Sequence, residues 1–149
     1  MAGDFEAQNP DYAAVVAASF AKQRFLALIG TELESVTPGQ ATLSVPFNTK
    51  ISQQQGFFHG AALGALGDTA SGYASLSLMP VGSEVVTVEY KVNFLKPAVG
   101  ERLVVVGTVL RAGRSITVAQ SDIFVRAADG AQTLVGALQG TFMRVELPG

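Results

Sequence analysis

Residues 60–78 of this chain read GAALGALGDTASGYASLSL, a stretch in which nearly every side chain is small or apolar. This composition predicts a helix that other elements enclose, because a helix on a surface would carry a polar stripe. Gly64, Gly67 and Gly72 fall in its interior, where each costs about 0.5–1 kcal/mol relative to alanine. We therefore expect the backbone of this helix to approach a sheet or a ligand closely.

Helix and strand patterns lie on both sides of this segment. Before it, the sequence predicts one helix over residues 12–28 and two strands over 30–36 and 41–47. After it, Pro80 ends the helix, and four strands follow, over 84–95, 103–110, 115–126 and 133–145. Short connections between these strands favour antiparallel pairing. The predicted fold class is α+β, an antiparallel β-sheet wrapped around a long central helix.

The strand at 84–95 shows the clearest alternation. Apolar residues occupy one set of alternate positions and polar residues the other, namely Val86, Val88, Tyr90, Val92 and Phe94 against Thr87, Glu89, Lys91 and Asn93. This pattern predicts a half-buried strand. With 149 residues and no linker or repeat, we expect a single domain over 1–149 whose first part, 1–29, is helical.

Composition argues against several classes of protein. A net charge of −2 gives no basic footprint for nucleic acid. One histidine and no cysteine are too few donors for a tetrahedral zinc site, so no metal is expected. The uncharged runs are rich in Gly, Ser and Gln, which argues against a membrane span. The acidic N-terminus lacks the layout of a signal peptide, and we expect a cytoplasmic protein.

One carboxylate and one imidazole stand out in the apolar segment 51–83. Asp68 is its only formally charged side chain, and His59, the only histidine in the chain, lies just before Gly60. A carboxylate in such surroundings is costly unless it is hydrogen bonded or used in chemistry. Asp68 is therefore the first candidate for a functional residue.

Basic residues are concentrated further along the chain. Half of the ten Lys and Arg residues fall within 90–115, where Glu101 is the only acid: Lys91, Lys96, Arg102, Arg111 and Arg114. This cluster predicts either a solvated sheet face or a site for an anionic small molecule. The turn RAGRS at 111–115 favours the second reading, because arginine pairs bidentately with phosphate and glycine exposes backbone N–H groups.

Several motifs occur in order over the last two thirds of the chain. QQQGFFHG at 53–60 is followed, nine positions after its histidine, by Asp68; TVEYKVNFLKPA at 87–98, Gly100 and RAGRS at 111–115 come next. The ordered set resembles the hotdog-fold acyl-coenzyme A thioesterases of the phenylacetic-acid-degradation (PaaI-like) family. The resemblance implies hydrolysis of an acyl- or aryl-coenzyme A thioester.

The resemblance also implies an assembly. Asp68 lies eight residues after Gly60, about 12 Å along one helix, so the two cannot easily share a reaction centre within one subunit. In the family, two equivalent sites form in a twofold dimer, with Gly60 of one chain facing Asp68 of the other. Two such dimers commonly pair into a tetramer.

Roles for the candidate residues follow from the resemblance. The Gly60 backbone N–H would polarise the thioester carbonyl, helped by the positive end of the helix dipole. Asp68 would be the general base that activates water or the nucleophile that forms an anhydride. Gln53 would position the thioester or the water, and Thr87 would hold the water or the carboxylate. His59 would orient the loop and contact the thioester region.

Coenzyme A is expected as part of the substrate, with no separate cofactor. The residues assigned to its phosphates are Lys96, Pro97, Arg111, Gly113, Arg114 and Ser115. The acyl pocket is expected to be lined partly by the small-residue helix and by Phe57, Phe58 and Tyr73. Two other functions stay open, a hotdog dehydratase or hydratase acting on similar thioesters and a non-catalytic acyl-thioester sensor.

Overall fold

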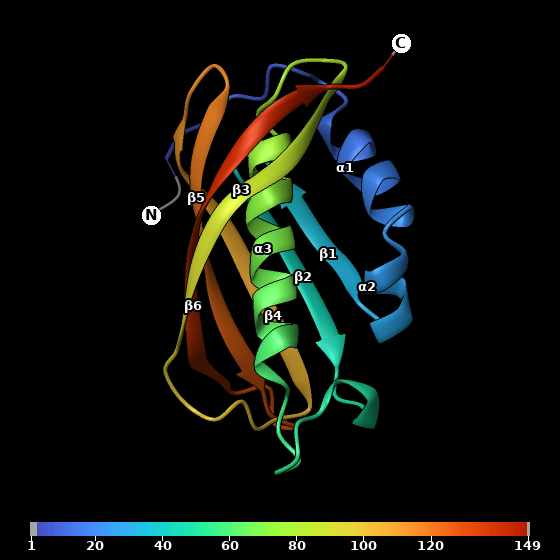
Figure 1. The fold of residues 1–149 in the computed structure, drawn as a ribbon, viewed down its shortest axis with the longest axis vertical. Helices are drawn as coiled ribbons and strands as arrows, with labels where there is room; N and C mark the ends of the chain where they lie inside the picture. The colour runs from blue at the N-terminus through green and yellow to red at the C-terminus, as the bar shows by residue number, and fades with distance from the viewer. Residues whose placement is uncertain (1–2, 149) are drawn as a thin grey trace.

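A six-stranded antiparallel sheet curves around one long helix, α3, in the computed structural model, which describes residues 3–148 (Figure 1). The strand order is β1-β2-β4-β5-β6-β3, and the predicted fold class is confirmed. The elements are α1 (Tyr12–Ala21), α2 (Arg24–Ile29), β1 (Glu32–Thr37), β2 (Gln40–Pro46), η1 (Thr49–Ile51), α3 (Gly60–Leu76), β3 (Ser83–Phe94), β4 (Arg102–Ala112), β5 (Ile116–Arg126) and β6 (Gln132–Glu146). Within residues 3–148, no helix is both long and apolar enough to cross a membrane.

The core lies between α3 and the concave face of the sheet. Leu63, Leu66 and Ala70 of α3 are buried against the strands, together with Val105 and Ile123. A second buried cluster surrounds Tyr73 near the other end of the helix. The helix is enclosed, as its composition predicts.

Close approach of helix and sheet explains glycines in both elements. A Cβ on Gly67 would lie 2.9 Å from Cδ1 of Leu138. A Cβ on Gly107 of β4 would collide with the backbone of Ala70. The Ser121 hydroxyl donates to the Gly67 carbonyl oxygen over 2.8 Å. The predicted close approach is confirmed at Gly67, while Gly107 shows that the strand contributes a glycine to the same contact.

Gly107→Ala is expected to lower the free energy of unfolding by about 1–3 kcal/mol, because the added methyl group overlaps backbone that cannot rotate away. Urea denaturation measures this change. Gly72→Ala is the matched control, since a Cβ there would come no closer than 3.7 Å to a neighbouring side chain. Equal stability of the Gly107→Ala variant and the wild type would show that helix and strand are less tightly packed.

The helix predicted over 12–28 is wrong as a single element. The chain breaks at Lys22 and Gln23 between α1 and α2, where both N–H groups bond back to carbonyl groups three residues earlier. The two helices bury side chains in different clusters, Val16 in the one around Tyr73 and Leu26 in the one around Leu66. The bend lets both helices contact the core.

The alternation predicted for 84–95 is correct beyond Val88, where Tyr90, Val92 and Phe94 lie on the side of α3, but its faces are wrong before Val88 and its burial is wrong. The register shifts between Thr87 and Glu89, so Val88 is an extra residue that reverses the alternation. Thr87 therefore faces α3, as do Tyr90 and Phe94 beyond the bulge. Most of β3 is exposed because it is an edge strand. Its exposed apolar side chains are Val86, Val88, Tyr90 and Phe94.

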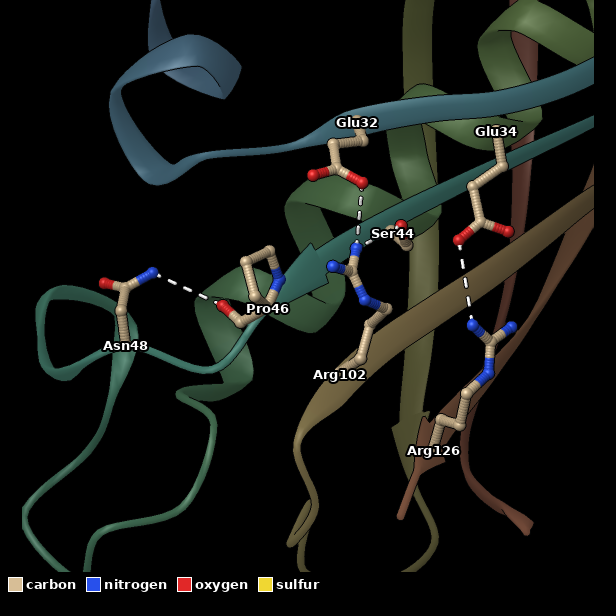
Figure 2. Close-up of polar contacts among 7 residues, drawn as sticks. All are labelled: Glu32, Glu34, Ser44, Pro46, Asn48, Arg102 and Arg126. Carbon is tan, nitrogen blue, oxygen red and sulfur yellow. Dashed lines mark hydrogen bonds and ion pairs between the residues drawn. The ribbon is translucent and has the colours of Figure 1, made fainter. Parts of the chain in front are cut away.

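Ion pairs tie β1 to more distant strands of the sheet. Figure 2 shows Glu32 and Glu34 pointing towards Arg102 and Arg126, with N–O distances of 3.0 and 4.0 Å. Arg102 also donates to the Ser44 hydroxyl over 2.9 Å. Such partly exposed pairs contribute about 0–1 kcal/mol each. The pair of Arg102 and Glu32 matters for the predicted anion site, because Arg102 is already bound to a carboxylate.

Candidate active site

Asp68 and Thr87 meet at the open edge of the sheet. Asp68 lies in the middle of α3, and Thr87 comes from β3 just before the bulge. The Thr87 hydroxyl donates a hydrogen bond of 2.7 Å to Oδ1 of Asp68. The bulge creates this contact, because strict alternation would turn Thr87 and Tyr90 to opposite faces. Two predicted site residues are thus brought together within one chain.

The surroundings of Asp68 shift its protonation equilibrium. Burial raises the pKa of the Asp68 carboxyl above its ordinary value, and the hydrogen bond from Thr87 opposes this effect. A raised pKa makes the carboxylate a better proton acceptor than a free aspartate. The arrangement suits a general base or a nucleophile held in a fixed orientation.

A small hollow of about 80 Å³ opens beside this pair. Its walls come from three places in the chain: Asp68, Thr69, Gly72 and Tyr73 of α3, Val85 and Thr87 of β3, and Gln23 at the junction of α1 and α2. Tyr73 therefore lines a hollow next to Asp68. Phe58, also expected in the acyl pocket, is instead buried in the core, edge-to-face with Phe47 at 5.2 Å.

The start of α3 offers a hydrogen-bond donor. His59 caps the helix, with its Nδ1 accepting a bond of 2.9 Å from the Ala61 N–H. Because Nδ1 accepts this bond, the neutral ring carries its proton on Nε2. The Nε2–H group of this exposed side chain is therefore a hydrogen-bond donor. Within residues 3–148, the Gly60 N–H has no hydrogen-bond partner. Free N–H groups at a helix start favour a developing negative charge.

Gln53 is engaged within its own loop. Its Oε1 accepts from the N–H groups of Gln55 and Phe57, and its Nε2 donates to the Gln55 side chain. This loop precedes α3 at the Gly60 end, whereas Asp68 lies about two turns further along the helix. One chain therefore forms two separate groups, Gln53–His59–Gly60 and Asp68–Thr87.

The basic turn is exposed at the other end of the helix. Arg111, Gly113, Arg114 and Ser115 line a hollow of about 340 Å³. Arg114 also borders a larger hollow of about 480 Å³, which lies beside the C-terminal end of α3 and includes Arg144. The hollow of about 480 Å³ beside the predicted phosphate turn is thus several times larger than the one of about 80 Å³ beside Asp68.

Lys96 and Pro97 lie away from that turn within one chain. Lys96 donates its backbone N–H to Val135, near the start of β6, whereas Arg144 beside the turn is near the end of β6. Arg102 is paired with Glu32. The basic residues of 90–115 therefore do not form one continuous patch in the single chain.

Sequence reasoning missed Arg144 and Gln23. Arg144 lies 30 residues after Arg114 in a strand whose pattern marks only its apolar face, so nothing in the sequence indicated that it borders the same hollow. Gln23 donates to the Tyr73 hydroxyl over 3.2 Å. Its position depends on the break between α1 and α2, which the sequence pattern did not predict.

Comparison with known proteins identifies the family. The model of the thioesterase superfamily matches residues 55–131, a segment that contains every predicted site residue except Gln53. A protein from Halobacterium salinarum, provisionally named an esterase, is 30% identical over 139 residues, or 89% of this chain and 91% of the relative. The chain belongs to the thioesterase superfamily.

Solved structures of other proteins share the fold. A thioesterase family protein from Silicibacter pomeroyi is 37% identical, with a TM-score of 0.88 over 91% of this chain and 99% of that one. The PaaI protein of the Escherichia coli phenylacetic acid degradation operon is 21% identical, with a TM-score of 0.76 over 90% and 94% of the two chains. The predicted membership among hotdog-fold thioesterases is confirmed.

Proposed function

We propose that this thioesterase-superfamily protein hydrolyses a small acyl- or aryl-coenzyme A thioester, with Asp68 as the general base or the nucleophile. The observation that carries the proposal is the Thr87–Asp68 hydrogen bond of 2.7 Å at the open sheet edge. It holds a partly buried carboxylate in one orientation while leaving the adjoining hollow accessible. Thioester hydrolysis requires such a group together with donors for the oxygen that becomes negative.

In the general-base route, Asp68 takes a proton from water as the water oxygen attacks the thioester carbonyl carbon. The carbonyl oxygen becomes negative and is stabilised by the Gly60 N–H. Collapse of this intermediate breaks the carbon–sulfur bond, releases the acid, and returns the proton to the coenzyme A thiolate. In the nucleophilic route, an oxygen of Asp68 attacks the same carbon, the carbon–sulfur bond breaks, and the coenzyme A thiolate leaves as an anhydride forms. Water then cleaves the anhydride to the free acid and the Asp68 carboxylate, and the remaining proton goes to the thiolate. Both routes give the same products.

The site also requires a partner chain. Phe94 lies over Gly60, and Thr87 lies beside Asp68. Antiparallel pairing of two β3 edges about a twofold axis between Tyr90 and Lys91 would therefore bring the Gly60 end of one chain to Asp68 of its partner. The exposed apolar side chains of β3 support this pairing, since an uncovered apolar edge favours association.

The same pairing would unite the proposed coenzyme A residues. It carries Lys96 of one chain towards the start of the partner's β3, at the sheet end where Arg114 and Arg144 border the large hollow. A single chain completes neither the site for the thioester nor the site for the phosphates. The same twofold axis would complete both. Association of two dimers into a tetramer, a single domain over 1–149 and a cytoplasmic location stay predictions from the sequence.

Release of free thiol from a panel of short, branched and aromatic acyl-coenzyme A substrates tests the proposed activity. We expect turnover of at least one member and a dimer or a multiple of it in size-exclusion chromatography with light scattering. Tight binding of the panel without thiol release would instead indicate a non-catalytic sensor. A monomeric protein with full activity would contradict the shared site.

Arg114→Ala is expected to raise KM about tenfold to hundredfold, the effect of losing a charged hydrogen bond to phosphate. Turnover should change little, because the phosphates are separated from the thioester by the pantetheine arm. Steady-state kinetics measure both constants. Lys22→Ala is the control, an exposed cation outside both hollows of the basic turn. An unchanged KM in Arg114→Ala would remove the phosphate role.

A further inference from the structure

A chain of hydrogen bonds connects the wall of the hollow beside Asp68 to Glu84. The Ser19 hydroxyl donates to Oε2 of Glu84 over 3.1 Å, so the contact of 3.2 Å between the hydroxyls of Ser19 and Tyr73 uses the Tyr73 proton. The Tyr73 oxygen in turn accepts a bond from Nε2 of Gln23. Tyr73 is therefore saturated as both donor and acceptor.

Gln23 keeps free hydrogen-bonding capacity. Its Nε2 carries a second proton, and within residues 3–148 its Oε1 has no partner. The side chain is half-buried and borders the hollow. A carboxamide fixed by one bond and free at both remaining positions can donate to and accept from a ligand hydroxyl group.

Gly72 has no steric reason to be glycine. A Cβ there would lie 3.7 Å from Phe142 and 3.8 Å from Val85, which is ordinary contact. Its φ is not positive, so alanine fits the backbone and would favour the helix. Because Gly72 borders a hollow of about 80 Å³, a methyl group would fill part of a space that amounts to a few water volumes at roughly 30 Å³ each.

Charge restricts what can enter. Among the described residues, 3–148, no basic side chain lines the hollow, whereas Asp68 lines it and Glu84 ends the hydrogen-bond chain behind it. Two carboxylates near the hollow disfavour an anionic ligand. The space, the free amide and the charge together suit a short, neutral group that carries a hydroxyl.

We propose that this hollow binds the acyl group of the substrate, that Gly72 sets its width, and that the Gln23 side-chain amide selects acyl groups bearing a hydroxyl. The proposal rests on the proposed function, because it places the acyl group of that thioester beside Asp68. It assigns specificity to residues outside the predicted site motifs, one of them positioned by the junction of α1 and α2.

Binding of two analogues tests the proposal without relying on turnover. Both are ketones with a methylene group between the sulfur and the carbonyl carbon, one mimicking butanoyl-coenzyme A and the other carrying a terminal hydroxyl in addition. Isothermal titration of the wild type should give about three- to tenfold tighter binding of the hydroxyl form, the range for one neutral hydrogen bond.

Two variants separate the roles of the residues. Gln23→Met keeps the length of the side chain and should abolish the preference, whereas Gln132→Met, at an exposed residue at the start of β6, should retain it. Gly72→Ala should weaken binding of both analogues about tenfold while its unfolding midpoint stays equal or rises. The midpoint shows that any loss of binding is not a loss of fold.

The outcomes distinguish this proposal from the proposed activity. Equal affinities of the wild type for the two analogues, or Gly72→Ala binding both as the wild type does, overturn the specificity proposal even where thioesters are hydrolysed. The expected preferences without thiol release support the subsite and overturn hydrolysis. Absence of both binding and thiol release overturns the two together.

Discussion

Asp68→Asn is expected to lower turnover about 10²–10⁴-fold, the range for losing a positioned general base. Asparagine has nearly the same volume, and its side-chain oxygen can still accept the hydrogen bond that Thr87 donates to the carboxylate. The variant should therefore fold. Thiol release under saturating substrate measures the loss, with circular dichroism as the check on folding. Full activity in the folded variant would contradict the catalytic role.

The pH dependence follows from the raised pKa of Asp68. The rate constant kcat/KM should rise with pH as the carboxyl loses its proton, with an inflection above the ordinary range of aspartate. Thr87→Val removes the hydrogen bond that lowers this pKa, so it should move the inflection further upwards. If Thr87→Val does not move the inflection, the group that titrates is not Asp68.

Stability should respond to pH at the same residue. Because the pKa is higher in the folded than in the unfolded state, the unfolded chain binds fewer protons between the two values. At pH values below the pKa of the unfolded state, Asp68 therefore leaves the free energy of unfolding unchanged. As pH rises through the pKa of the folded state, the ionised carboxylate lowers that free energy. Asp68→Asn should be more stable than the wild type at pH 7 and equal to it in acid, as measured by urea denaturation.

Removing a single N–H group at Gly60 is expected to lower turnover about 10²–10³-fold, the range for losing one oxyanion donor. Gly60→Pro makes this change at a position where proline is tolerated, the first residue of a helix. His59 already has the extended backbone that proline requires of the preceding residue, with φ −67° and ψ 138°. Gly60→Ala is the matched control, because it keeps the N–H while adding the same Cβ, 3.0 Å from the Phe94 ring.

Mixed dimers of Gly60→Pro and Asp68→Asn chains test whether one site uses two chains. Each mixed dimer has one site with both groups intact and one site lacking both. Random association should therefore restore about a quarter of wild-type turnover from two nearly inactive variants. Co-expression with two affinity tags isolates the mixed dimers. If both groups acted within one chain, purified mixed dimers would stay as inactive as their parents.

The order of helices and strands was largely predictable, because it depends on local patterns. Enclosure of residues 60–76 followed from small side chains all round the helix, and each of the four strands after it was found at nearly its true bounds. The two failures, at Lys22–Gln23 and at Val88, have a common cause. The helix break and the β-bulge both interrupt the repeat of apolar side chains, and both depend on packing against distant segments. The residues on either side of each interruption keep a regular pattern, so the sequence does not reveal it.

Asp68 was recognisable from the sequence alone, because a single charge in 33 residues is visible without a fold. Membership in the thioesterase superfamily was likewise predictable, since it depends on motifs that the chain carries in order. Tertiary structure alone decided which groups surround Asp68. The bulge turned Thr87 towards it, and the break between α1 and α2 brought Gln23 to the hollow beside it. Such contacts depend on strand register and helix direction, which are fixed by packing between distant segments and not by the residues nearby.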